Sequence, residues 1–206
     1  MAAAGKVERH HIEALVQLTT TGFCMHRSWG FGRIKTLDPV FARFTIDFDN
    51  RAGHAMELAF AAESLKPIPK DHILARKAVD LDSLRQMAAT QHLELVKVVL
   101  TSYGGKATAD QIQQVLVPEV IGADWKKWWE AARRELKKDG HFQVPLKKSE
   151  PIIYEVQEVS LQQRLMEEFR AAKGLKARIV AANELLKNVH DLADKGAAGT
   201  ELVALL

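Results

Sequence analysis

Cysteine is almost absent from this sequence, because Cys24 is the only one among its 206 residues. A single cysteine excludes both a disulfide within the chain and a zinc site built from several thiolates, and it fits a reducing compartment. Long hydrophobic runs are missing as well, and a membrane-spanning helix would need one. The first residues, MAAAGKVERHH, lack the apolar core of a secretory signal. We therefore expect a cytoplasmic protein.

Patterns that mark an active site are also missing. The sequence has no serine in a nucleophile elbow and no HExxH pair. Its GFGR stretch lacks the spacing and the following helix of a phosphate-binding loop. The adjacent His10 and His11 point in different directions, which is poor geometry for two ligands of one metal. We expect no enzyme, and hence no catalytic residues, no cofactor and no metal.

Cys24 and His26 leave one enzymatic alternative open. They are two residues apart in the strand-like FCMH, where such residues share a face. A reactive thiolate would need a depressed pKa in a partly exposed, positively charged setting. Free cysteines are among the most often buried residues, so a structural Cys24 is favoured over a thiol-dependent enzyme.

Basic residues are concentrated in one region. The whole chain has a net charge of +3, whereas the segment from Trp125 to Lys148 contains eight basic and three acidic residues, a net charge of +5. A local excess of this kind is typical of a surface that binds phosphates or an acidic protein, although a solvated helix face has the same composition. The candidate nucleic-acid-binding residues are Lys126, Lys127, Arg133, Arg134, Lys137, Lys138, Lys147 and Lys148.

The stretch DWKKWWEAARRELKKDGHF, residues 124–142, predicts a helix with an aromatic face and a basic face. Asp124 is expected to cap the N-terminus, because its carboxylate can accept from free N–H groups of the first turn. We assign Trp125, Trp129 and Leu136 on the apolar face to the core, and the basic residues to the candidate contact surface.

Residues 22–69 change to a period of two. FCMH, GFGRIKTLD, ARFTIDF and HAMELAF indicate four short strands, with breaks at Ser28–Gly30, Asp38–Pro39 and Asp49–Gly53. Strands this short and strongly bent cannot cover both faces of a flat sheet, so we expect a small closed or half-open barrel, SH3-like or Tudor-like. A helix is expected before it, within residues 1–21.

A second module is expected over residues 70–157, after the stiff boundary Pro67-Ile68-Pro69. Helical periodicity covers Asp71–Ala89, Leu93–Tyr103 and Ala109–Leu116, with Thr108 as a cap, and the tryptophan helix follows. FQVP and IIYEV then indicate a β-hairpin. Three helices followed by a hairpin form the winged-helix arrangement, in which the third helix is the recognition element and the hairpin is the wing. Here the third helix is the tryptophan helix, and the tip of the wing would carry Lys147 and Lys148.

The last segment, residues 158–206, is predicted to be helical and to complete an α+β chain. Its first apolar face ends at the interruption Lys173-Gly174, and a second face follows. The final ELVALL presents apolar side chains that need a partner, so we expect a longer protein or a contact with another subunit. The second helical face, which follows Gly174, consists of Ile179, Ala182, Leu185, Leu186 and Val189.

Two of these segments resemble a known family. HRSWGFGRIKTLDPVFARFTIDFDNRAGHAMELAFAAESLKPI resembles the small barrel in the N-terminal extensions of long bacterial GreA/GreB-type transcription elongation factors. VLTSYGGKATADQIQQVL, with DWKKWWEAARRELKKDGHFQVPLKKSEPIIY, is similar to the winged-helix-like module that follows there. The barrel is more loosely similar to the RNA polymerase-interacting domains of CarD and the transcription-repair coupling factor. Together the similar segments cover about residues 22–156.

The resemblance implies a cytoplasmic factor that contacts RNA polymerase, but it does not imply transcript cleavage. In that family, stimulation of cleavage depends on a long coiled-coil hairpin with acidic residues at its tip. The helices expected after Ser160 are short and interrupted at Gly174, so they do not match that hairpin.

The leading hypothesis is therefore a non-catalytic transcription elongation module. The barrel would dock on RNA polymerase through an exposed strand edge and residues near Arg27, Trp29 and Arg33. The winged helix would contact nucleic acid, or a further polymerase surface, through its basic residues. The second hypothesis is a stand-alone DNA- or RNA-binding protein with the barrel as a support. A thiol-dependent enzyme is the third.

Overall fold

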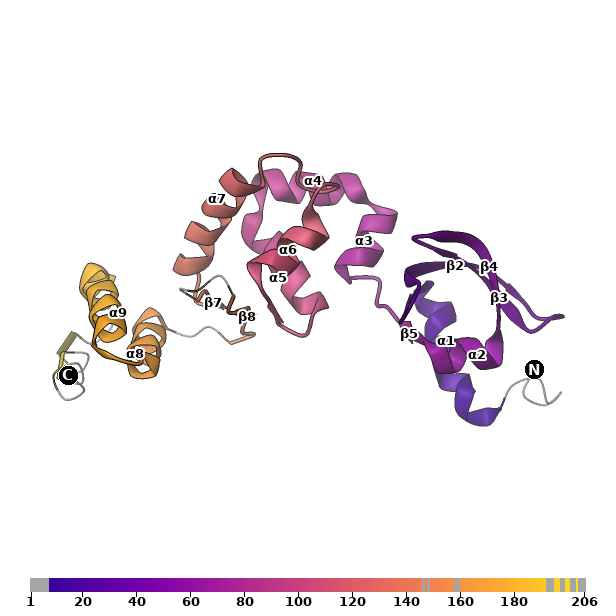
Figure 1. Ribbon diagram of the computed structural model, residues 1–206, viewed down its shortest axis with the longest axis horizontal. Helices are drawn as coiled ribbons and strands as arrows, with labels where there is room; N and C mark the ends of the chain where they lie inside the picture. Colours follow the sequence, from indigo (N-terminus) through magenta and orange to yellow (C-terminus); the bar gives the residue numbers. More distant parts are fainter. Residues whose placement is uncertain are drawn as a thin grey trace. The chain divides into compact units, whose positions relative to one another are not determined.

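The chain divides into two compact units, a sheet unit and a helical unit (Figure 1). The sheet unit comprises residues up to Thr90 together with 118–120, and the helical unit comprises 91–117 and the residues from Ile121 onward. The structure is a computed structural model. It describes residues 8–145, 147, 149–157, 160–191, 195–196, 199–200 and 203.

Five antiparallel strands form the sheet unit, in the order β4-β3-β2-β1-β5. The four strands predicted from the alternating pattern are confirmed as β1–β4, whereas β5 was not predicted. The sheet is open, with β4 and β5 as its two edges, so the predicted SH3-like or Tudor-like barrel does not close. The bounds are β1 Phe23–His26, β2 Gly30–Asp38, β3 Arg43–Phe48, β4 Arg51–Glu57 and β5 Leu65–Pro67.

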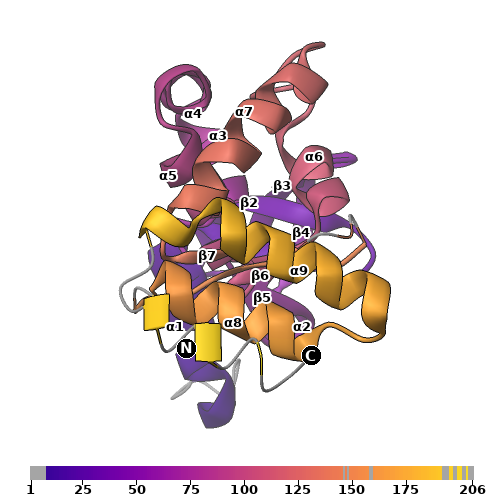
Figure 2. The same ribbon diagram turned by 90° about the vertical axis from the view of Figure 1, so that its left-hand side faces the viewer.

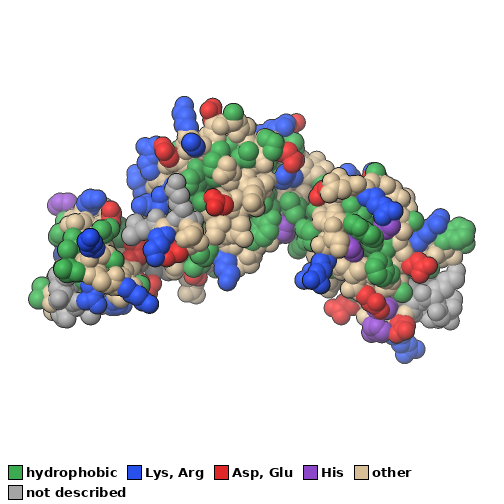
Figure 3. All heavy atoms as spheres, in the orientation of Figure 1, with side chains coloured by type: hydrophobic (Ala, Val, Ile, Leu, Met, Phe, Trp, Pro, Cys, Tyr) green, Lys and Arg blue, Asp and Glu red, His purple; other side chains and the backbone are tan. Residues whose placement is uncertain are grey.

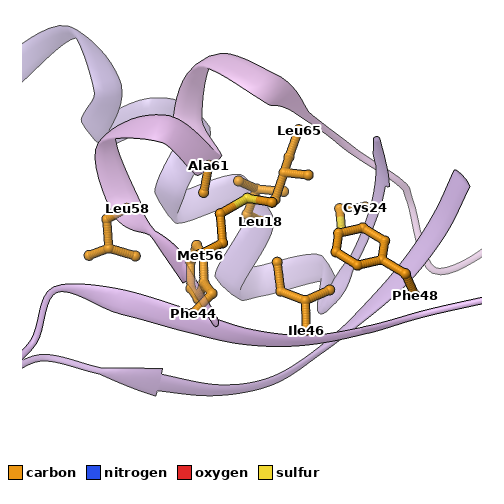
Figure 4. Packing of buried hydrophobic residues seen from close by; sticks show 9 residues of the cluster. All are labelled: Leu18, Cys24, Phe44, Ile46, Phe48, Met56, Leu58, Ala61 and Leu65. Atoms are coloured by element: carbon orange, nitrogen blue, oxygen red, sulfur yellow. The ribbon is translucent and has the colours of Figure 1, made fainter. Parts of the chain in front are cut away.

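Two helices explain why the sheet stays open. The predicted strand HAMELAF ends at Glu57, and Leu58–Ser64 forms helix α2 instead. Helix α1, Ile12–Thr21, and α2 pack on one face of the sheet, so they bury the apolar face that closure of a barrel would otherwise bury. Figure 4 shows the core between them, made of Leu18, Cys24, Phe44, Ile46, Phe48, Met56, Leu58, Ala61 and Leu65.

Glycines shape the β1–β2 hairpin at two positions. Gly30 has a φ of 73°, a left-handed conformation that glycine adopts without steric cost, and it begins β2 opposite His26. At Gly32 an added Cβ would lie 2.7 Å from the Phe48 ring and 3.0 Å from Cys24 Sγ. Only a residue without a side chain therefore lets β2 approach the core this closely.

The helix predicted over residues 71–89 is two helices. Helix α3, Ile73–Val79, ends at Asp80, and α4, Leu81–Thr90, follows directly. The backbone of Asp80 is not helical, with φ −147° and ψ 72°, while its carboxylate accepts from the Ser83 N–H at 3.0 Å. This local hydrogen bond starts the new helix, as short polar side chains do at helix N-termini.

The helical unit contains the predicted three helices and hairpin. Its second helix begins with the predicted cap: Thr108 Oγ1 accepts from the Gln111 N–H, and Gln111 Oε1 accepts from the Thr108 N–H. Strand β6 was not predicted; it joins the hairpin in a three-stranded antiparallel sheet of order β6-β8-β7. The bounds are α5 His92–Ser102, β6 Lys106–Ala107, α6 Ala109–Leu116, α7 Trp125–Lys138, β7 Phe142–Gln143 and β8 Ile152–Tyr154.

Two further helices lie side by side at the end of the helical unit (Figures 1 and 2). Helix α8, Leu161–Ala171, and α9, Leu175–Lys187, are separated at Gly174 as predicted, and a short 3-10 helix, Val189–Asp191, follows. The predicted α9 face is only partly correct, because Leu185 is buried whereas Ile179 is 48% and Leu186 is 62% exposed. None of the described helices has the length and apolar character needed to cross a membrane.

Candidate functional site

Helix α7 carries most of the basic residues that the sequence singles out. It runs from Trp125 to Lys138, as the periodicity predicts. The predicted cap is wrong, because the Asp124 side chain makes no capping hydrogen bond. Its φ of −86° and ψ of 26° differ from the extended conformation in which a capping side chain reaches back to the first turn.

The tryptophans of α7 form a stacked cluster that is half-buried, which corrects their assignment to the core. The ring centroids of Trp125 lie 5.5 Å from Trp128 and 5.2 Å from Trp129, with interplanar angles of 24° and 14°. The His92 ring meets Trp128 edge-on, and His92 Nδ1 lies 2.9 Å from Glu135 Oε1. Only Leu136, of the three α7 residues assigned to the core, is fully buried.

The basic side chains of α7 divide along its length. Lys126 and Lys127, near the N-terminus, are exposed, and neither forms an ion pair with the residues that the structure describes. Lys137 and Lys138 are exposed in the last turn, where positive charge is favourable to the helix dipole. Figure 3 shows Lys and Arg side chains gathered over this part of the molecule. Arg134 is exposed, and its Nε donates to the Glu130 carbonyl oxygen at 3.2 Å.

The remaining predicted basic residues lie where α7 meets the hairpin. Arg133 is half-buried and its Nη2 donates to the Pro145 carbonyl oxygen at 2.9 Å, so it ties the helix to the hairpin connection. Lys147 is exposed, with its Nζ 3.3 Å from Glu150 Oε1. Lys148 lies outside the described residues. The structure thus brings Arg133 and Lys147 together around a shallow depression that Trp129 also lines.

Arg164 on α8 is an important residue that the sequence reasoning missed. It is only 6% exposed, and its guanidinium donates to the carbonyl oxygens of Lys137, Asp139 and Phe142 at 2.8, 2.7 and 2.8 Å. The Lys137 carbonyl belongs to the last turn of α7, whose carbonyls lack helical partners, and the other two follow that turn. A buried cation therefore anchors α8 to the end of α7. The partners are at least 22 residues away along the chain, so no local pattern could reveal them.

A cleft of 280 Å³ lies between the end of α7 and the pair α8–α9. Arg134, Lys137 and Lys138 line one side, while Glu168 and Glu184 line the other. Burial raises the pKa of the Glu168 carboxyl, and the charges of Arg164 and Lys137 partly oppose that shift. Half of the α7 basic residues therefore face acidic groups of the same unit.

The sheet unit has an aromatic cluster of its own around Trp29, in the β1–β2 turn. The Trp29 ring stacks on His26 at 4.2 Å and meets His54 at 4.5 Å, and the Arg51 guanidinium lies 5.7 Å from its centre. His26 Nδ1 accepts from the backbone N–H groups of Ser28 and Trp29, which fixes the turn. Burial lowers the pKa of His54, and the nearby Arg51 and His26 lower it further.

The structure separates the three residues predicted to contact a protein partner. Arg27 is exposed in the same turn as Trp29. Trp29 is half-buried and packs against the core side of the sheet, next to Phe48. Arg33 is exposed on β2 directly after Gly32, whose missing side chain would point at that core. Because side chains alternate along a strand, Arg33 lies on the opposite face from Trp29.

Cys24 is fully buried, as favoured from the sequence. Burial raises the pKa of its thiol to about 12. Its Sγ lies 3.5 Å from the Gly32 carbonyl oxygen, and His26 uses Nδ1 for backbone N–H groups. Within the described ranges, no group of three or more His, Cys, Asp or Glu side chains is placed to hold a metal ion.

Comparison with known proteins gives a consistent set of relatives. Residues 74–159 match the GRAD helix-turn-helix domain family. A putative GreA-associated domains protein of Treponema pallidum (strain Nichols) is 32% identical over 176 residues, which are 84% of this chain and 26% of that protein. A transcription elongation factor GreA of Chlamydia trachomatis serovar D is 25% identical over 179 residues, 85% of this chain and 25% of that protein.

A transcription elongation factor GreA of Chlamydia pneumoniae is 31% identical over 143 residues, which are 68% of this chain and 20% of that protein. The chain thus spans about a quarter of the length of the curated relatives it matches. No solved structure matches the chain.

Proposed function

We propose, from its homology to long GreA-type proteins and its GRAD helix-turn-helix domain, that the chain is a non-catalytic module of a cytoplasmic transcription elongation factor. Its relatives named as elongation factors carry this proposal. The partner that an elongation factor must contact is RNA polymerase, so we assign the polymerase-binding surface to the sheet of residues 22–69. The helix-turn-helix region of residues 70–157 is assigned a contact with nucleic acid or with a second polymerase surface.

The sheet module docks on RNA polymerase through the β1–β2 turn, with Trp29 as the anchor and Arg27 beside it. A half-buried tryptophan held by its neighbours is typical of an interface anchor, because little conformational entropy is lost on binding. Strands β4 and β5 offer sheet edges for a partner strand. Arg33, on the other face of β2, contributes only where the polymerase wraps around the sheet edge.

The helical module adopts a winged-helix arrangement, in which α7 is the recognition helix and the β7–β8 hairpin is the wing. It contacts nucleic acid, or a second polymerase surface, through the basic residues of α7 and the wing. The observation that supports this contact is the pair Lys126 and Lys127, exposed and without ion-pair partners among the described residues. When exposed lysines neutralise phosphates, the counterions condensed on the nucleic acid are released, which favours binding.

A pull-down with the whole chain as bait tests polymerase binding. We expect RNA polymerase from a cell lysate of a GreA-containing bacterium to be retained, and Trp29→Ala to weaken retention by roughly 2 kcal/mol, or about thirtyfold. Phe60→Ala is the matched control, because Phe60 is an aromatic residue on α2 that is 51% exposed. If the unaltered chain retains no polymerase, the proposal fails.

A stand-alone DNA- or RNA-binding protein is the second candidate, and the charge of α7 supports it. Binding to a short duplex at several salt concentrations separates the two. Polymerase retention that persists at salt concentrations where duplex binding is lost supports the elongation module. Tight duplex binding without polymerase retention supports the stand-alone protein.

The thiol-dependent enzyme is disfavoured by the burial of Cys24 and the raised pKa of its thiol. We expect a thiol reagent at neutral pH to label the folded chain far more slowly than the chain in denaturant. Rapid labelling of the folded chain would revive the enzymatic alternative.

A further inference from the structure

We infer that the N-terminal half of α7 is a stacking site for the unpaired bases of single-stranded nucleic acid. The inference rests on the proposed contact between α7 and nucleic acid, and it specifies which form of nucleic acid fits. It is carried by the arrangement of the indoles, by the cations around them and by the shape of the adjacent surface.

The indoles of α7 are arranged as a stepped set of nearly parallel plates. The interplanar angles are 24° for Trp125 and Trp128, 14° for Trp125 and Trp129, and 25° for Trp128 and Trp129. All three are half-buried, so part of each ring system meets solvent. A base can continue such a set by stacking on its outer member, since every base has a π-face whatever its sequence.

Cations occur on the same helix as these plates and around the adjacent depression. Lys126 and Lys127 lie between the tryptophans in sequence and are exposed without ion pairs among the described residues. Trp129 borders the shallow depression together with Arg133 and Lys147, and Glu150, the ion-pair partner of Lys147, lines it as well. A base that stacks on Trp129 therefore lies beside Arg133 and Lys147, and Lys126 and Lys127 add positive charge within one turn of the same helix. Aromatic plates with cations along the backbone path are the usual construction of single-strand binding sites.

The shape of the depression indicates an open stacking site rather than a closed pocket. Its volume is 20 Å³, which is room for about one water molecule and far too little for a base. A base would lie across the rim, against Trp129, with one edge left in solvent. Such a site binds bases with little sequence preference, because it does not reach their hydrogen-bonding edges.

A duplex fits this surface less well. In a duplex the faces of the bases are covered by their neighbours, and only the edges are accessible in the grooves. Tryptophan offers one N–H donor and no acceptor, so the indoles of Trp125 and Trp129 are poor readers of base edges. An acidic protein would satisfy the lysines, but it would not use the parallel plates, whereas an unpaired strand uses both.

The test measures binding of the full chain to a fluorescently labelled oligonucleotide of mixed sequence. The same sequence is presented as single-stranded DNA, single-stranded RNA and blunt duplex, at equal salt. We expect both single strands to bind at least tenfold more tightly than the duplex and to quench the intrinsic tryptophan fluorescence. Trp129→Leu and Trp125→Leu should each weaken single-strand binding by about tenfold, with an unchanged dependence on salt.

Two further variants separate stacking from folding. Trp129→Phe keeps a smaller ring and should weaken single-strand binding less than Trp129→Leu does, while Phe60→Leu removes an exposed ring of the sheet unit and should change nothing. Circular dichroism and thermal melting identify any variant that loses its fold. A preference for one single strand over the other assigns the natural ligand to DNA or to RNA within the same inference.

The outcomes also separate this inference from the proposed function. Equal or tighter duplex binding, or single-strand binding that the tryptophan variants leave unchanged, overturns the stacking site while polymerase retention still stands. Polymerase retention that depends on Trp129, without binding of any oligonucleotide, shows that the indoles contact protein and likewise overturns the inference. Loss of both polymerase and nucleic-acid binding in the unaltered chain removes the proposed function itself.

Discussion

The surroundings of Trp29 and of the α7 tryptophans differ in charge and in support. Trp29 is continuous with the buried core through Phe48, and its ring is flanked by two histidines. The α7 indoles stack mainly on one another, and Lys126 and Lys127 of the same helix have no ion pair with the described residues. Binding at Trp29 should therefore depend on apolar area and respond little to salt. Binding at α7 should weaken steeply as salt rises, because phosphate contacts release counterions.

The two surfaces are also held in place by different means. The end of α7 is anchored by the buried Arg164, whereas the Trp29 cluster depends on the close approach of β2 to Phe48 at Gly32. One support is a set of charge-assisted hydrogen bonds, and the other is the absence of a side chain. Variants of each support should therefore damage one surface and spare the other.

The largest effect is expected for Arg164→Leu. The substitution removes the guanidinium donor from the carbonyl oxygens of Lys137, Asp139 and Phe142, and it should lower the free energy of unfolding of the helical unit by roughly 3 kcal/mol. Urea unfolding followed by tryptophan fluorescence measures the loss. Lys176→Leu replaces an exposed cation on α9 and should change it by about 0.5 kcal/mol or less. Equal losses for both variants would contradict an anchoring role.

The matching variant in the sheet unit is Gly32→Ala. Its methyl group would lie 2.7 Å from the Phe48 ring, a distance that forces β2 or the ring to move, so we expect a loss of roughly 1–3 kcal/mol. Polymerase retention through Trp29 should fall, while oligonucleotide binding by α7 should persist. The control is Gly122→Ala in the helical unit, where an added Cβ meets nothing within 4 Å. A fully stable Gly32→Ala chain would show that β2 adjusts freely.

The double variant Lys126→Ala, Lys127→Ala tests the charge difference directly. Removing two phosphate contacts should reduce the slope of log affinity against log salt by about 1.4 on single strands. Polymerase retention through the sheet unit should not change. The control pair is Lys66→Ala, Lys70→Ala, two exposed lysines of the sheet unit. An unchanged slope would mean that Lys126 and Lys127 are only solvated.

Sequence periodicity predicted most elements, because amphipathic faces are local properties. It located α5, α6, α7, the β7–β8 hairpin and four strands, and it identified the Thr108 cap. It failed where a distant partner decides the outcome. Leu58–Ser64 is helical because its apolar side chains complete the core above the sheet, which an alternating strand pattern cannot show.

Distant partners also account for the errors at the candidate site. The spacing of the tryptophans shows that they share a face, but not how much of that face a neighbouring element covers. The helices packed against α7 cover Ala132 and Leu136 fully and the indoles only in part. No local pattern distinguishes Arg164 from other cations on a polar helix face, since its carbonyl partners lie in α7, in β7 and between them.

The smallest expected effect concerns the cleft where α7 meets α8 and α9. Burial raises the pKa of Glu168 above its ordinary value of 4.5, so the folded chain binds a proton there more readily than the unfolded chain does. The ionised carboxyl therefore costs stability above the raised pKa. This cost diminishes as the pH falls through that pKa, and it vanishes below the ordinary value.

Glu168→Gln removes the charge and should stabilise the helical unit at pH 7 by about 0.5 kcal/mol, a small gain because the group is only partly buried and faces Arg164. At pH 4, where the wild-type carboxyl is largely protonated, the gain should disappear. Urea unfolding at both pH values measures it, with Glu167→Gln as the exposed neighbour for comparison. Destabilisation at pH 7 would instead show that Glu168 holds the basic residues of α7 in place, and that the cleft is maintained by ion pairing across it.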